Sequence, residues 1–129
     1  MTENYIDIDG YWGVLFCCCY KRSDKDRMRG IMESFGLDEY HVIEAMSVLS
    51  HRNTGMTISR GDVTMSVMFV SPATSHEQLM DTVAHEIDHV QYAICRHYDV
   101  ERGSEDAAWL QGYLMRRITC ILERKEECE

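Results

Sequence analysis

The sequence lacks the features that mark a multidomain, secreted or membrane-spanning protein. Its 129 residues contain a single proline, and no glycine- or serine-rich linker, internal repeat or low-complexity tract divides it. The longest apolar run, Tyr11 to Tyr20, is far shorter than the roughly 20 residues that a helix needs to cross a bilayer. Acidic residues occupy the N-terminus, where a signal peptide carries positive charge. We therefore expect one cytoplasmic domain, residues 1–129, with no membrane partner.

Positive charge is also scarce. The 13 Lys and Arg residues are outnumbered by 22 Asp and Glu residues, which gives a formal net charge of −9. Because binding to phosphate backbones requires a basic surface, nucleic acid is not expected as a partner. The six cysteines include no C-x-x-C pair, and Cys17, Cys18 and Cys19 are consecutive. This spacing favours reduced, largely buried thiols over a disulfide framework or a cysteine-based metal site.

The hydrophobic pattern predicts an α+β fold with a small antiparallel or mixed sheet of about three strands and about four helices. The predicted strands are Gly13–Tyr20 and a hairpin, Met56–Ser59 and Val63–Ser71, around Arg60-Gly61-Asp62. The predicted helices follow caps at Ser23-Asp24, Asp38, Ser75 and Ser104. In the second hairpin strand, apolar residues alternate with smaller or polar ones, so one face is predicted to be buried and the other less so.

The most informative motif is H-E-x-x-H, formed by His85, Glu86 and His89 within the third predicted helix. From the composition of this chain, about 0.025 accidental matches are expected, so chance is a poor explanation. Histidines four residues apart share one helical face and can bind a single zinc ion. The glutamate between them lies where it can accept a proton from a water molecule that the ion activates.

A catalytic zinc ion usually takes three protein ligands, so a third must come from elsewhere. Glu105 is the best candidate, because a turn after Tyr98 lets the next helix fold back with a carboxylate at its start. Asp106 is an alternative ligand, and both acids also favour the helix dipole without any metal. His97 is about 12 Å farther along the same helix than His89, which is too far to share an ion.

These residues resemble the gluzincin-type metallopeptidases, in which H-E-x-x-H is followed by a glutamate at the start of the next helix. The segment Ser104–Leu110, with Gly112-Tyr113-Leu114 behind it, looks like the third-ligand helix of small phage- and prophage-type zincins with a minimal ImmA/IrrE-like core. The resemblance covers about Thr64 to Ile118, and residues 1–55 carry no such motif. It implies a minimal zincin-like fold with His85, His89 and Glu105 as zinc ligands and Glu86 as the general base.

The resemblance implies a zinc-dependent peptidase that acts on protein or peptide substrates. Tyr92, on the metal side of the helix, is the favoured oxyanion donor among side chains that also include Arg96, His97 and Tyr98; the alternative is that Tyr92 only packs. Within the resemblance, Met65–Val70 is an edge strand that pairs with extended substrate; the alternative is an ordinary structural strand. A second functional hypothesis is a regulatory or binding module that zinc stabilises and that has little turnover. The oligomeric state is not indicated by the sequence.

Overall fold

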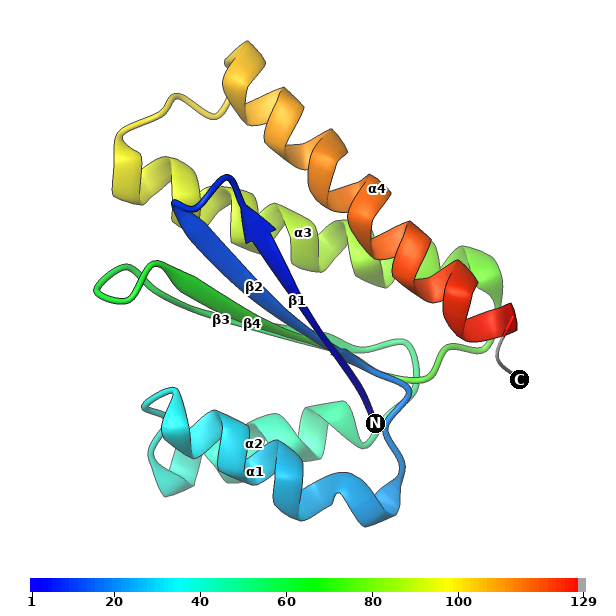
Figure 1. Ribbon diagram of the computed structural model, residues 1–129. Helices are drawn as coiled ribbons and strands as arrows, with labels where there is room; N and C mark the ends of the chain where they lie inside the picture. Colours follow the sequence, from blue (N-terminus) through cyan, green and yellow to red (C-terminus); the bar gives the residue numbers. More distant parts are fainter. Residues whose placement is uncertain (128–129) are drawn as a thin grey trace.

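A computed structural model of the chain describes residues 1–127 and contains a four-stranded sheet between two pairs of helices (Figure 1). The strands are β1 (Thr2–Ile8), β2 (Trp12–Cys18), β3 (Gly55–Arg60) and β4 (Met65–Val70). The α-helices are α1 (Lys25–Ser34), which follows the short 3-10 helix η1 (Arg22–Asp24), α2 (Glu39–Leu49), α3 (His76–Tyr98) and α4 (Glu105–Glu127). None of the helices within residues 1–127 combines the length and apolar character needed to cross a bilayer.

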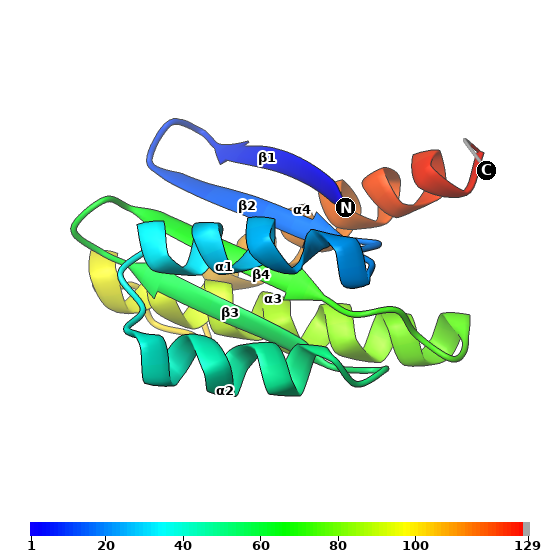
Figure 2. The same ribbon diagram turned by 90° about the horizontal axis from the view of Figure 1, so that it is seen from below.

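The sheet has the strand order β1-β2-β4-β3 and is mixed, because β2 and β4 run parallel while the two outer pairs are antiparallel. Helices α1 and α2 cover one face of the sheet, and α3 and α4 cover the other (Figures 1 and 2). The predicted α+β class and the four helices are confirmed. The strand that the sequence did not predict is β1, in which exposed Glu3 and Asp7 interrupt the apolar pattern.

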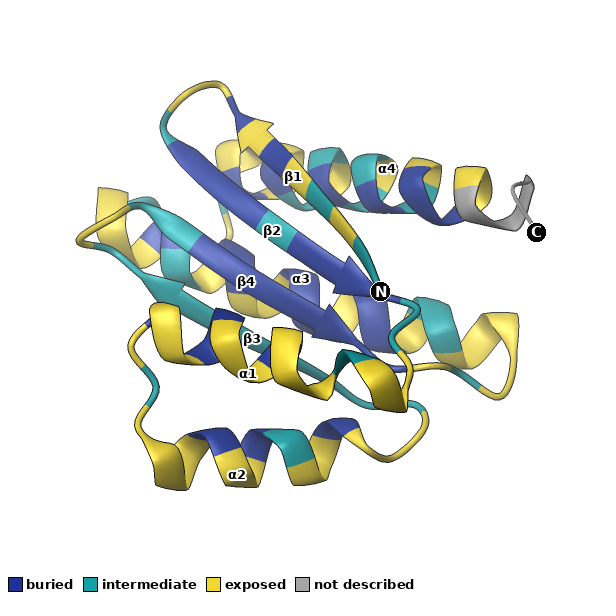
Figure 3. Cartoon of the chain, turned by 60° about the horizontal axis from the view of Figure 1, so that its bottom comes forward, coloured by how far each residue is buried: buried dark blue, intermediate teal, exposed yellow. Residues whose placement is uncertain are grey.

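Strand β4 lies inside the sheet, and this overturns two expectations. It pairs with β2 on one side and with β3 on the other, so Met65–Val70 is not an edge strand. Helices cover both faces of the sheet, and β4 is buried along most of its length (Figure 3). Ser66 and Met68 are consequently as buried as Val67 and Phe69. The prediction that one face of β4 would be less buried was wrong. The alternation of apolar and polar residues suggested that only one face of the sheet is covered, whereas helices cover both. The edge strand beside α3 is β3.

Helix α3 carries the H-E-x-x-H motif and begins and ends close to where the sequence predicts. The side chain of Ser75 accepts a hydrogen bond from the Gln78 backbone N–H at 3.1 Å, and Asp99 ends the helix with a left-handed backbone (φ 55°). The apolar stripe of α3 is buried against the sheet and α4; its members include Val83, Ile87, Val90 and Ile94. This packing fixes the rotation of α3, and therefore the side on which its histidines lie.

Candidate metal centre

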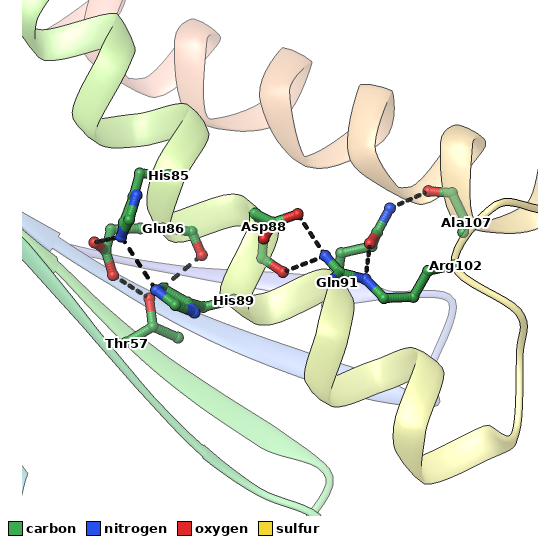
Figure 4. A network of polar contacts seen from close by, with 8 residues as sticks. All are labelled: Thr57, His85, Glu86, Asp88, His89, Gln91, Arg102 and Ala107. Atoms are coloured by element: carbon green, nitrogen blue, oxygen red, sulfur yellow. Dashed lines mark hydrogen bonds and ion pairs between the residues drawn. The ribbon is translucent and has the colours of Figure 1, made fainter.

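The two histidines of α3 point their Nε2 atoms at one another. The distance from His85 Nε2 to His89 Nε2 is 3.2 Å, and the imidazole rings meet edge to face (Figure 4). Two nitrogen ligands of a tetrahedral zinc ion lie about 3.3 Å apart, because each Zn–N bond is about 2.0–2.1 Å long. The pair therefore has the nitrogen spacing that a shared metal ion requires.

Glu86 lies between the histidines and strand β3 and is only 3% exposed. Its Oε1 accepts a hydrogen bond of 2.8 Å from the hydroxyl of Thr57 on β3, and its Oε2 lies 4.0 Å from His85 Nε2. The backbone of Gly55 lies against the same carboxylate: a Cβ atom at position 55 would stand 2.7 Å from Glu86 Cγ. The Thr57 hydroxyl thus holds the buried carboxylate beside the imidazoles, and the missing side chain at Gly55 leaves room for it.

His85, Glu86 and His89 form a possible metal-binding group. One ligand atom from each lies within 4.8 Å of the other two, and no further set of three His, Cys, Asp or Glu residues in the described chain meets this condition. Imidazole nitrogens with a carboxylate oxygen suit zinc and other divalent transition metals alike. The donor set thus fits a metal ion, while leaving the choice of metal open.

A groove of about 790 Å³ opens between β3 and α3, and the metal-binding group forms part of its wall. Gly55, Thr57 and Gly61 contribute the β3 side, and α3 contributes the two histidines, Glu86 and residues up to His97. His97 packs edge to face against Trp12, farther along the groove from His85. As the sequence predicts, His97 does not belong to the metal-binding group.

Tyr92 also lines this groove and is 46% exposed. Its ring lies beneath the guanidinium of Arg102, with 5.2 Å between the guanidinium carbon and the ring centroid. Tyr98, in contrast, donates its hydroxyl hydrogen to the backbone carbonyl of Tyr11 at 2.6 Å. Tyr92 therefore lies on the correct side of α3 for the predicted oxyanion role, which stays a prediction.

Glu105 and Asp106 are exposed in the first turn of α4, and the structure does not gather either of them with the histidines. The first turn of α4 is fixed beside Gln91, whose Nε2 donates a 3.1 Å hydrogen bond to the Ala107 carbonyl. Gln91 is two residues beyond His89, or about 200° around the helix. Asp106 lines a different hollow, with Tyr11 and Trp109. The third-ligand role of Glu105 stays a prediction.

Asp88, which lies between the two histidines in the sequence, points elsewhere. Its carboxylate pairs with Arg102, and Arg102 Nε donates to Gln91 Oε1 at 3.0 Å (Figure 4). These contacts join α3 to the loop before α4. The side-chain contacts of Asp88 in the described residues are therefore with Arg102 and not with either imidazole.

Thr57 and Gly55 are the residues of this centre that the sequence did not indicate. Asn53-Thr54-Gly55 has the composition of a turn, and Thr57 is an unremarkable residue in a short strand. Their role depends on β3 being the strand under α3, which is a long-range property of the sheet. No local signal in the sequence carries that information.

Comparison of the chain with family models, with curated proteins and with solved structures gives no match in any of the three.

Proposed function

We propose that the protein is a zinc-dependent peptidase. The observation that carries this proposal is the 3.2 Å convergence of His85 Nε2 and His89 Nε2 next to the buried carboxylate of Glu86. An H-E-x-x-H helix combines two nitrogen ligands with a proton acceptor, which are parts that metal-assisted hydrolysis of a peptide bond needs. The groove beside this group gives a peptide access to it.

His85 and His89 would hold the ion, and Glu86 would handle the proton. When bound, zinc supplies a Lewis acid that polarises a carbonyl and lowers the pKa of water from 15.7 to about 7. Glu86 accepts the proton of the attacking water at its carboxylate and passes it to the leaving amine. Thr57 restricts the carboxylate through its 2.8 Å hydrogen bond, so that Glu86 keeps one orientation during the transfer.

Strand β3 supports a proposal for how substrate binds. It is the last strand in the sheet, and within the described residues its backbone pairs with β4 alone. An extended peptide can add to such an edge through backbone hydrogen bonds, which aligns a scissile carbonyl without requiring a particular side chain. Thr57 on β3 contacts Glu86, so a peptide bound along this edge would pass the proton acceptor. The proposed substrates are therefore extended segments of proteins or peptides.

One observation favours a second candidate function, a module that zinc stabilises without substantial turnover. The structure gathers two histidines and Glu86, but no separate acidic ligand among the described residues. If Glu86 itself binds the ion, it cannot also serve as the general base. The protein would then hold zinc as a structural or regulatory element.

Replacement of Glu86 by Gln distinguishes these functions, because the amide preserves the shape of the side chain but cannot accept the proton. We expect Glu86→Gln to lower the rate of peptide cleavage by about 10²–10⁴-fold while the zinc content is unchanged. Cleavage is measured on a degenerate fluorogenic peptide mixture, and zinc by elemental analysis of purified protein. Glu77→Gln, an exposed change in the first turn of α3, is the control.

Undiminished cleavage by the Glu86→Gln protein would rule out Glu86 as the base. Loss of zinc together with an inactive wild-type protein would instead support the zinc-stabilised module.

A further inference from the structure

A second hollow is lined by residues at the starts of η1 and α1 and at the end of α2. Helices α1 and α2 cover the face of the sheet opposite to α3, which carries the histidines (Figure 1). The volume of the hollow is about 290 Å³. Lys21, Arg22, Lys25 and Arg52 contribute cationic side chains to it. It does not share a residue with the groove at the metal-binding group, so any ligand here belongs to a separate site.

The charge of this hollow is opposite to that of the protein as a whole. It holds four of the 13 Lys and Arg residues of a chain whose net charge is −9, and no Asp or Glu lines it. Across the part of the chain that the structure describes, none of the four cations takes part in an ion pair. The nearby acid Asp24 is bound by the Met1 ammonium at 3.1 Å and by the Lys21 backbone N–H at 2.7 Å. Local positive charge is therefore left available for an anion.

The floor of the hollow is apolar and uncharged. Met28 and Leu49 are buried core residues, and Met46 lies beside them. The Tyr20 hydroxyl donates a 2.7 Å hydrogen bond to the Leu49 carbonyl, and burial raises the pKa of the Tyr20 phenol further above its already high ordinary value, so this side chain adds no charge. A ligand that fits this surface needs an apolar body in addition to negative charge.

We propose that this hollow binds a small phosphate monoester that carries one apolar ring. Phosphate brings nearly two negative charges and several acceptor oxygens at neutral pH, which matches a rim of several cations better than a single carboxylate does. A ring of moderate size suits the volume, which is at the lower end of the range for small-molecule sites and too small for a folded domain. Met46, which is partly exposed, would contact the ring above the buried Met28 and Leu49, while Lys25 and Arg52 would contact the phosphate.

The test is calorimetric titration of the full chain with phenyl phosphate, inorganic phosphate and phenol. A chelator is present throughout, so that no phosphate can bind through a metal ion at His85 and His89. We expect phenyl phosphate to bind with a dissociation constant of about 1 mM or tighter, inorganic phosphate to bind at least about tenfold more weakly, and phenol not to bind measurably. The double variant Lys25→Gln/Arg52→Gln should weaken phenyl phosphate at least about tenfold.

Arg29→Gln is the matched control, because Arg29 is an exposed cation of the same helix α1 that does not line the hollow. It should leave the affinity unchanged. Equal affinity of the double variant and the wild-type protein would overturn the proposed site, and equal affinity for phenyl phosphate and inorganic phosphate would overturn the role of the apolar floor. Tighter binding of a glutamate-rich peptide than of phenyl phosphate would assign the hollow to an acidic protein segment instead. None of these results depends on whether the protein cleaves peptides.

Discussion

Helix α3 carries two polar groups on different sides, and the two groups use their hydrogen-bonding capacity differently (Figure 4). We call His85, Glu86, His89 and Thr57 the acceptor cluster, and Asp88, Gln91, Arg102 and the Ala107 carbonyl the α3–α4 network. In the α3–α4 network, donors and acceptors match: Arg102 donates to Asp88 and to Gln91, and Gln91 donates to Ala107.

The acceptor cluster is matched only in part, through the Thr57 hydroxyl that donates to Glu86 Oε1 at 2.8 Å. The two imidazole nitrogens face each other at 3.2 Å, where at most one of them can donate to the other, and Glu86 Oε2 lies 4.0 Å from His85 Nε2. A cation stabilises acceptor atoms that face one another, whereas a chain of matched hydrogen-bond donors and acceptors is complete without a cation. Residues of one helix, a few positions apart, can therefore serve ligand binding on one side and helix packing on the other.

The largest expected effect is that of His85→Ala. Removal of one of the two converging nitrogens should raise the zinc dissociation constant by more than about 100-fold, since loss of a supporting contact alone typically costs 10–100-fold. The affinity is measured by competition with a chromophoric chelator. The control is His97→Ala, which removes a histidine from the same helix and groove but not from the acceptor cluster. Full zinc affinity in the His85→Ala protein would contradict the metal centre.

A smaller effect is expected from Gly55→Ala. The added Cβ would lie 2.7 Å from Glu86 Cγ and 3.0 Å from Oε2, so the carboxylate must move while both histidines stay in place. Because a displacement of about 1 Å can cost roughly 100-fold in rate, we expect cleavage to fall by about that factor and zinc affinity to change less than about tenfold. Both are measured on the same preparation.

Gly103→Ala provides the control for this prediction, because a Cβ there meets nothing within 4 Å. Unchanged cleavage by the Gly55→Ala protein would show that the position of Glu86 does not depend on β3. A parallel loss of zinc and of cleavage would instead place Glu86 among the metal ligands.

In the α3–α4 network, Gln91→Leu should affect stability but not zinc. Gln91 is 7% exposed, and its replacement removes the side-chain donor to the Ala107 carbonyl and the acceptor of Arg102 Nε. The free energy of unfolding should fall by about 1–3 kcal/mol. Chemical denaturation of the metal-free protein measures this, with Gln78→Leu at an exposed position of α3 as the control. A large drop in zinc affinity would show that the two groups are coupled.

The sequence predicted the parts of this comparison that depend on local pattern. Ser75 caps α3 and the helix ends near Tyr98 because capping and turn residues stand next to the helix in the sequence, and histidines four residues apart share one face because of helical geometry. The sequence did not reveal that β4 is interior, or that Thr57 and Gly55 lie under Glu86. Those facts depend on strand order and on pairing between distant segments, which neighbouring residues do not encode.

The smallest expected effect is that of a change at Glu105. The resemblance to gluzincins and the contacts of α4 lead to different expectations for this residue. The resemblance to gluzincins predicts that Glu105→Gln weakens zinc binding as much as His85→Ala does. The contact of Gln91 with Ala107 predicts a change of less than about threefold, because it holds the first turn of α4 about 200° around α3 from His89. Chelator competition on Glu105→Gln and Asp106→Asn separates the two predictions. A 100-fold loss in the first variant alone would mean that α4 approaches the histidines when metal binds; unchanged affinity in both would leave the two imidazoles and Glu86 as the protein groups nearest the ion.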